Sequence, residues 1–293
     1  SISKDDFYRM IDFIGRDNIL DANIFLEKLK RNKLKNNEVC FTFDDAIKCQ
    51  IDIALPVLED LKIKSFFFVY SSILEDNPDK LEVFRYFRTN CFTNIDNFYD
   101  NFYSVLDKDL KNFFEDNFKK IQSLIIKFPH YSIEDIKFRI VRDVYLKKKQ
   151  YNEIMFLMMK KKKFDYKEIY PILFFNGKDL KKLDSLGHII GLHSHSHPTF
   201  LEKLSYEEQK KEYEQCLSSL SKVLNKQKNE IKVMSHPCGS YNDYTLEILK
   251  ELGIELGFKQ IMTIEKEKGM KKINNSSLEI ARQDHSEIFK RMN

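Results

Sequence analysis

Apolar and polar positions follow one pattern that recurs along the chain: a short apolar run, a polar loop and then an amphipathic helix. The first run, Val39–Phe43, is almost wholly apolar, which is typical of parallel strands buried on both faces. It ends at Asp44 and Asp45, and the next segment has apolar residues at helical spacing, with Pro56 as an expected kink. A second apolar run, Ser65–Tyr70, predicts the following strand.

The second repeat of this pattern surrounds a cluster of histidines. It starts with a short helix that is expected to stop at Gly187, a residue type favoured just after a helix end. A strand at about His188–Leu192 then leads into the loop His193–Pro198, which is rich in histidine. The long helix behind this loop is indicated by a capping box of Ser205 and Glu208.

The third repeat completes the pattern and predicts the fold class. It has a strand near Ile231–Met234, a polar loop and the helix Asp243–Leu252, and further strands are expected at Ile254–Phe258 and Leu278–Arg282. Strands that alternate with helices predict an α/β fold with a parallel sheet, and this number of units favours a barrel. The loops that follow the strand C-termini share one rim in such a fold, so we expect the polar clusters to gather there.

Residues 74–170 have a different character, because they are rich in Phe, Tyr, Lys and Asp and contain no Gly. Apolar residues recur there at helical spacing, which predicts a helical cap subdomain inserted between the barrel parts 1–73 and 171–293. A lid over the substrate is one interpretation, and a bundle that supports the fold or an oligomer contact is another. The runs Lys147–Lys149 and Lys160–Lys163 are expected to be solvated helix faces; contact with an anionic substrate group or an acidic membrane surface is the alternative.

Composition excludes several classes of protein. The chain has 293 residues and 42% hydrophobic residues, with 25 Phe and 14 Tyr that must be buried, so disorder is excluded as its main state. The net charge of +4 does not indicate nucleic acid as a partner, and no apolar run approaches the roughly 18 residues of a membrane helix. Five cysteines without a CxxC pair argue against a disulfide scaffold, and no signal peptide is visible, so we expect a reducing, cytoplasmic location.

The residues Asp45, His193 and His197 form a candidate metal site. Two imidazoles and a carboxylate are a common ligand set for a catalytic divalent ion, above all zinc. Positions four apart on a straight strand stand roughly 13 Å apart, so the histidines can share an ion only if the chain turns after His193. Pro198 indicates that it does leave regular structure there, and His195 is expected to face away.

Asp44 and Asp45 are adjacent carboxylates, and metal binding by Asp45 does not explain why Asp44 stands beside it. Adjacent carboxylates repel each other unless a cation or hydrogen bonds compensate, so one can bind the metal while the other acts as general base. Helix capping explains one aspartate but not both. Arg282 could pair with the second aspartate or form a plain surface ion pair, and the loop around Cys238 could direct a backbone N–H toward an oxyanion or be an ordinary turn.

These segments resemble the motifs of the polysaccharide deacetylase family, the NodB-homology carbohydrate esterases of family 4. Thr42–Asp45 is similar to the TFDD motif, Gly191–Pro198 to the H-[ST]-x-x-H-P motif, and Ser235–Tyr241 to the loop of the third motif. The resemblance covers roughly residues 36–73 and 178–285. It implies a distorted (β/α) barrel and a metal-dependent hydrolase that removes N-acetyl, sometimes O-acetyl, groups from sugars.

Carried over by position, the resemblance implies a role for each residue. Asp44 is the implied catalytic base, while Asp45, His193 and His197 are the implied metal ligands. The backbone N–H of Cys238 is expected to help form the oxyanion hole.

The third motif departs from the family pattern. Ser235 stands where the family often has Arg, and Cys238 where it often has an aromatic residue. We expect Arg282 to take over the role of that arginine. His285 is the nearest candidate for the catalytic general acid, and His236 is the second.

The sequence therefore predicts a metal-dependent N-deacetylase that acts on an acetylated amino sugar or a carrier-linked saccharide in cell-surface glycan assembly. Its expected cofactor is a divalent ion, above all zinc, and no nucleic acid partner is expected. Two alternatives remain open, a metal-dependent amidase for a non-sugar amide and a catalytically silent carbohydrate-binding protein.

Overall fold

A computed structural model describes residues 2–106, 110–127, 131–260 and 276–292 of the chain. The chain divides into two compact units: Ser1–Asp79 together with Pro171–Asn293, and Lys80–Tyr170. The second unit begins at Lys80 rather than at residue 74. The reason lies in η3 (Ser71–Glu75), whose Ser71 and Ser72 amides donate to the Ser194 and His195 carbonyls of the first unit at 3.2 and 3.0 Å.

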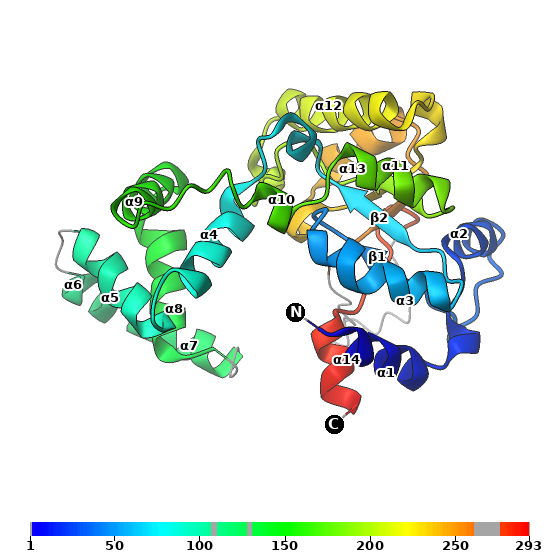
Figure 1. Ribbon diagram of the computed structural model, residues 1–293. Coiled ribbons are helices and arrows are strands. Elements are labelled where there is room, and N and C mark those ends of the chain that lie inside the picture. Colours follow the sequence, from blue (N-terminus) through cyan, green and yellow to red (C-terminus); the bar gives the residue numbers. More distant parts are fainter. Residues whose placement is uncertain (1, 107–109, 128–130, 261–275, 293) are drawn as a thin grey trace. The chain divides into compact units, whose positions relative to one another are not determined.

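The first unit is built on a five-stranded parallel sheet with the strand order β1-β2-β3-β4-β5 (Figure 1). The strands are β1 (Thr42–Phe43), β2 (Phe66–Val69), β3 (Ile189–Leu192), β4 (Val233–Ser235) and β5 (Leu256–Phe258). The sheet is a curled half-barrel, which confirms the expected distorted (β/α) barrel class.

Two of the expected strands are shorter in the structure. Val39 leaves the line of β1 and pairs in parallel with Ile19, and Ile280 makes a single parallel bridge to Phe258 instead of a full strand. Both segments lie at the margins of the sheet, where a strand has a hydrogen-bonding neighbour on one side only. Even so, the bridge at Ile280 brings the chain that follows to the C-terminal end of β5.

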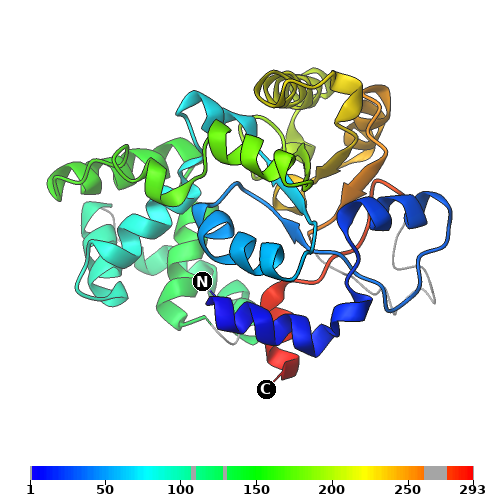
Figure 2. The same ribbon diagram turned by 45° about the vertical axis from the view of Figure 1, so that its right-hand side comes forward.

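The helices of the first unit connect and flank the strands, and α1 and α14 at the two chain ends pack against each other (Figures 1 and 2). These helices are α1 (Lys4–Ile14), α2 (Ala22–Lys30), α3 (Leu55–Asp60), α11 (Gly177–Ser185), α12 (Tyr206–Leu224), α13 (Asp243–Glu251) and α14 (His285–Met292). Ser205 and Glu208 form the expected capping box at the start of α12. Pro56 is the second residue of α3, and the π-helical turn η2 (Gln50–Ala54) runs directly into this helix, so the helix is irregular just before the proline.

The core of the sheet is aromatic. Phe66, Phe67 and Phe68 of β2 are fully buried, and the ring of Phe258 lies 5.3 and 5.4 Å from those of Phe66 and Phe68. Gly191 of β3 leaves the space that these rings occupy, since a Cβ there would come within 2.7 Å of Phe68. Close packing against Gly191 therefore fixes the position of β3, the strand from which the histidine loop starts.

The second unit is helical, as its spacing of apolar residues predicts. It contains α4 (Lys80–Asn90), α5 (Ile95–Val105), α6 (Lys111–Asp116), α7 (Phe118–Lys127), α8 (Ile133–Ile140) and α9 (Lys148–Lys161), and α10 (Tyr170–Leu173) spans the boundary. Its core holds the stacked rings of Phe98 and Phe102 against Phe138. Both lysine runs are exposed. None of the helices in the described ranges is long and apolar enough to cross a bilayer.

Candidate active site

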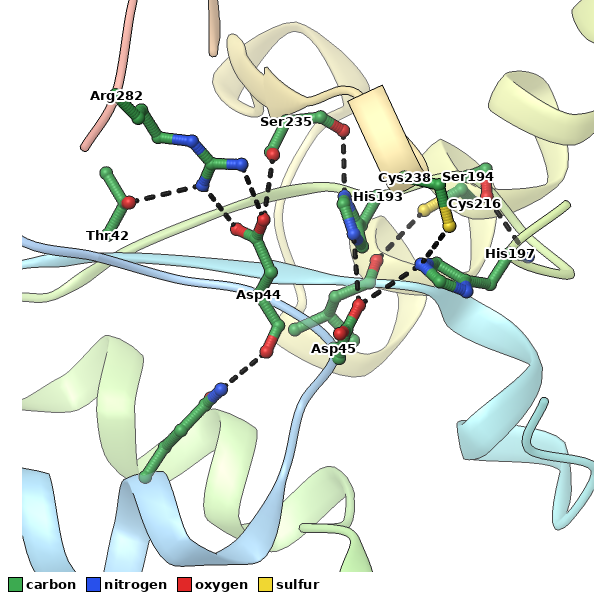
Figure 3. Close-up of polar contacts among 12 residues, drawn as sticks. Thr42, Asp44, Asp45, His193, Ser194, His197, Cys216, Ser235, Cys238 and Arg282 are labelled. Atoms are coloured by element: carbon green, nitrogen blue, oxygen red, sulfur yellow. Dashed lines mark hydrogen bonds and ion pairs between the residues drawn. The ribbon is translucent and has the colours of Figure 1, made fainter. Parts of the chain in front are cut away.

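The side chains of Asp45, His193 and His197 meet at the C-terminal end of the sheet. Asp45 follows β1, and the two histidines follow β3. The Asp45 Oδ1 atom lies 3.1 Å from His193 Nε2 and 3.2 Å from His197 Nε2, and one ligand atom from each residue falls within 4.8 Å of the others. Figure 3 shows the Asp45 carboxylate facing both rings.

The loop after His193 turns sharply enough to bring the two histidines together. Ser194 and His197 both have left-handed backbone angles, with φ of 64° and 55°. Such angles cost a non-glycine residue about 1–2 kcal/mol each, so the loop must be held by its contacts. One of these contacts is local, because the His197 amide donates to Ser194 Oγ at 3.1 Å.

The two rings differ in how they are oriented. His193 is 2% exposed, and its Nδ1 donates to the Ser235 carbonyl oxygen at 2.8 Å, which leaves the Nε2 lone pair for the cluster. A backbone acceptor that fixes the tautomer in this way is typical of metal-binding histidines. His197 is also buried, and its ring lies 5.2 Å from that of Tyr70.

The carboxylate of Asp45 fits a cation. Its Oδ1 atom is buried and has no hydrogen-bond partner, although two ring nitrogens lie close to it. Burial would raise the pKa of Asp45, but the imidazoles of His193 and His197 outweigh burial and hold that pKa well below its usual value. An ionised, unpartnered oxygen between two imidazoles suits a divalent ion, and two nitrogens with one oxygen are a donor set that zinc accepts.

Asp44 points the other way and is held by Arg282. The Nη1 and Nη2 atoms of Arg282 donate to Asp44 Oδ1 and Oδ2 at 2.8 and 2.7 Å, and Ser235 Oγ donates to Oδ2 at 3.1 Å (Figure 3). Arg282 is itself positioned by bonds to the Lys259 carbonyl at 2.5 Å and to Thr42 Oγ1 at 3.2 Å. The two adjacent aspartates thus have separate partners.

The surroundings of Asp44 keep it ionised. Burial raises the pKa of a carboxyl group, but the charge of Arg282, the charge of His193 and the hydrogen bonds from Arg282 outweigh it, so the pKa of Asp44 is lowered. Asp44 is therefore a carboxylate at neutral pH, and a carboxylate beside a metal site can accept a proton.

Cys238 lies on the same rim as His197. It stands in the turn η7 (Pro237–Gly239) with a φ of 53°, and its Sγ atom is 4.0 Å from His197 Nε2. The thiol thus borders the cluster without joining the group of Asp45 and the two histidines. The oxyanion role of its backbone N–H stays a prediction.

Neither histidine expected as general acid reaches the cluster. His285 begins α14, its side chain is 57% exposed, and its Nδ1 lies 3.5 Å from Asp284. His236 is buried with its Nε2 2.8 Å from the Leu278 carbonyl, and burial lowers its pKa to about 4. The structure therefore does not support His285, because the chain turns into an exposed helix directly after the margin of the sheet.

His195, the middle histidine of the loop, points out of the cluster and contacts Ser71 Oγ through Nδ1 at 2.8 Å.

Three further residues support the site, although the sequence predicted no role for their side chains: Thr42, Ser235 and Glu212. Thr42 and Ser235 lie inside the recognised motifs, and their hydroxyl groups gave a usable signal. Glu212 lies within α12, and the sequence around it gave no signal, because its role follows only from its contacts with the histidine loop in the folded chain.

A parallel half-barrel with an Asp-His-His cluster and a second carboxylate at the C-terminal strand ends is an arrangement that suits metal-dependent hydrolysis. Residues 143–257 match the model of the family described as polysaccharide deacetylase. The resemblance indicated by the motifs is thus confirmed over this part of the chain. The matched stretch includes His193, His197 and Cys238, whereas the fold brings Asp44 and Asp45 to them from outside it.

Solved structures of deacetylases share the fold over almost the whole chain. The deacetylase PplD of Streptococcus pyogenes, solved in complex with acetate, has a TM-score of 0.54 at 16% identity and covers 100% of this chain and 88% of its own. IcaB from Ammonifex degensii has a TM-score of 0.54 at 14% identity, with 100% and 88% covered. The BpsB deacetylase domain from Bordetella bronchiseptica has a TM-score of 0.53 at 10% identity, with 97% and 84% covered. No curated protein sequence matches the chain.

Proposed function

We propose that this protein is a metal-dependent hydrolase that removes the N-acetyl group from an amino sugar within a saccharide. The observation that carries the proposal is the position of Asp45 Oδ1 at 3.1 and 3.2 Å from two imidazole nitrogens, with the carboxylate of Asp44 next to it in the chain. Hydrolysis of an amide needs a polarised carbonyl, an attacking water and a proton for the leaving amine. The cluster supplies groups suited to each of these needs.

Asp45, His193 and His197 would hold the divalent ion, for which zinc fits the donor set. When bound, such an ion polarises the acetyl carbonyl and lowers the pKa of water. Burial of both histidine rings and the Ser235 acceptor on His193 keep these donors in place.

Asp44 would move the proton. Its carboxylate accepts a proton from the attacking water while Arg282 keeps both of its oxygens oriented. The water oxygen forms a bond to the acetyl carbon, the carbon–nitrogen bond breaks, and the proton on Asp44 passes to the leaving nitrogen, which yields acetate and an amine. We assign this return step to Asp44 because neither His236 nor His285 lies at the cluster.

The substrate class rests on the family, which implies an acetylated polysaccharide. An amino sugar, or a carrier-linked saccharide, in cell-surface glycan assembly is the finer proposal. It draws support from solved deacetylases that share the fold, one of them in complex with acetate.

The decisive experiment combines metal analysis with a substrate panel. Protein purified without chelator is assayed for bound metal and for acetate release from acetamido sugars, their oligomers and non-sugar acetamides. We expect one equivalent of a divalent ion and acetate from the sugar substrates. The Asp44→Asn variant should keep the metal and lose turnover, whereas Asp45→Asn should lose both.

A catalytically silent carbohydrate-binding protein is the second candidate. It is favoured by one observation: neither histidine that was expected to be the general acid lies at the cluster. Metal and saccharide binding without acetate release from any member of the panel would establish this candidate and overturn the proposed enzyme. Faster release from non-sugar acetamides than from sugars would indicate an amidase instead.

A further inference from the structure

The carboxylate of Glu212 closes the loop between the two clustered histidines. Glu212 projects from α12, and its Oε2 accepts from the backbone amides of His195 and Ser196 at 2.9 and 2.7 Å. Its Oε1 accepts from Ser196 Oγ at 2.7 Å. A single side chain, distant from the cluster in sequence, thus satisfies three donors in the middle of the histidine loop.

The other side of the same loop is held by η3. The carbonyls of Ser194 and His195 accept from the Ser71 and Ser72 amides, and the His195 ring contacts Ser71 Oγ. The element η3 therefore holds two carbonyl groups of the loop, and Glu212 holds two of its amide groups. Neither of them touches Asp45, His193 Nε2 or His197 Nε2.

The loop needs this support because its conformation is unfavourable by itself. Ser194 and His197 both adopt left-handed angles, which non-glycine residues avoid. Both residues flank the two amides that Glu212 binds. Bonds to a charged carboxylate are stronger than those between neutral groups, so Glu212 contributes strongly to the turn that lets both Nε2 atoms face one oxygen.

We infer that Glu212 is a positioning residue that sets the metal affinity of the Asp45, His193 and His197 cluster. The inference rests on the proposed metal site and goes beyond it, because Glu212 supplies no ligand. Without its carboxylate, the separation of the two ring nitrogens is held less firmly before the ion binds. Loss of such supporting contacts typically weakens metal binding by about 10- to 100-fold.

The test uses the full chain and zinc itself as the probe. Zinc dissociation constants are measured by competition with a chromophoric chelator for wild type, Glu212→Ala and Glu212→Gln, with Glu214→Gln as the control. Glu214 lies on the same helix and is exposed. We expect about 10- to 100-fold weaker binding for Glu212→Ala, a smaller loss for Glu212→Gln, which keeps one carbonyl acceptor, and no change for Glu214→Gln.

A second readout separates positioning from a general loss of stability. The visible absorption of bound Co²⁺ reports ligand geometry, and we expect its bands to shift in Glu212→Gln while the apo protein still unfolds cooperatively. Wild-type zinc affinity and an unchanged Co²⁺ spectrum in the folded Glu212→Gln variant would overturn the inference. The proposed function fails on a different result, namely absence of acetate release from a wild-type protein that does bind zinc.

Discussion

Arg282 and Asp44 meet edge to edge, with two parallel hydrogen bonds of 2.8 and 2.7 Å between the guanidinium and the carboxylate. The pair joins the chain after β1 to the last segment at the margin of the sheet. Arg282 also donates hydrogen bonds to the Lys259 carbonyl oxygen and to Thr42 Oγ1, so the plane of its guanidinium group is held by three different residues. This relationship leaves Asp45 to the histidines and gives the two adjacent aspartates different tasks.

The first prediction concerns this pair. A lysine at position 282 keeps the charge but lacks the planar group that makes two parallel bonds to Asp44, so Arg282→Lys should lower kcat for acetate release about 10- to 100-fold. Zinc affinity should change little, because Arg282 makes no hydrogen bond to Asp45, His193 or His197. The control is Arg291→Lys, at an exposed position. A kcat that equals wild type would contradict the assigned role.

The second prediction concerns the Cys238 thiol. Its Sγ atom lies 4.0 Å from His197 Nε2 and is partly exposed, so an alkyl group on this sulfur would enter the cluster. We expect iodoacetamide to weaken zinc binding at least about tenfold, and bound zinc to slow the alkylation of Cys238. Peptide mass spectrometry with and without zinc measures the alkylation, and competition with a chromophoric chelator measures the zinc affinity.

The matched control for this experiment is Cys238→Ser. The serine variant should bind zinc as wild type does and should keep that affinity after iodoacetamide treatment. Weaker binding in the treated serine variant would show that another cysteine is responsible.

The third prediction concerns the stability of the protein at mildly acid pH. His188 is buried, and its Nδ1 accepts from the Ser65 amide at 3.1 Å, so the ring must stay neutral. Burial lowers the pKa of His188 to about 4 from an ordinary value of 6.5. Between these values the unfolded chain binds a proton that the folded chain does not, so stability falls as the pH drops from about 6.5 to 4.

We expect this term to amount to about 1–2 kcal/mol after allowance for solvent screening. His188→Asn keeps an acceptor for Ser65 but cannot titrate, so its unfolding free energy should fall less between pH 7.5 and 5. Urea unfolding of both proteins at the two pH values measures the difference. Parallel losses in wild type and variant would rule out His188 as the source.

The fourth prediction concerns the packing beneath the histidine loop. A Cβ atom at Gly191 would lie 2.6 Å from the Val233 carbonyl oxygen and 2.7 Å from the Phe68 ring. Backbone must therefore move, and Gly191→Ala should lower the unfolding free energy by about 2–4 kcal/mol. Thermal and denaturant unfolding provide the measurement.

Gly177→Ala is the control for this substitution. Gly177 begins α11, and a Cβ there would lie 3.5 Å from Val223, an ordinary contact. This variant should be neutral or slightly stabilising, since alanine is the better helix former. Equal stability of the two variants would show that the space at Gly191 is not limiting.

Local pattern was enough for much of the fold. The strands β2 and β3 lie within the expected runs Ser65–Tyr70 and His188–Leu192, and the capping box at Ser205 starts α12. These features depend on residues a few positions apart, whose periodicity and hydrogen bonding are visible in the chain itself. Lengths were less certain at the margins of the sheet, as Val39 shows by pairing with Ile19.

The residues of the site likewise fall into those that the sequence predicted and those that only the folded chain reveals. The sequence by itself determined which side chains could hold an ion or move a proton, because TFDD and the histidine loop carry those groups at the ends of apolar runs. Only the tertiary structure decided that Arg282 bonds Asp44, that Glu212 clamps the histidine loop, and that His285 turns away into solvent. The physical reason is that these relationships join segments far apart in the chain, and the distances between them are set by strand register and core packing rather than by local spacing.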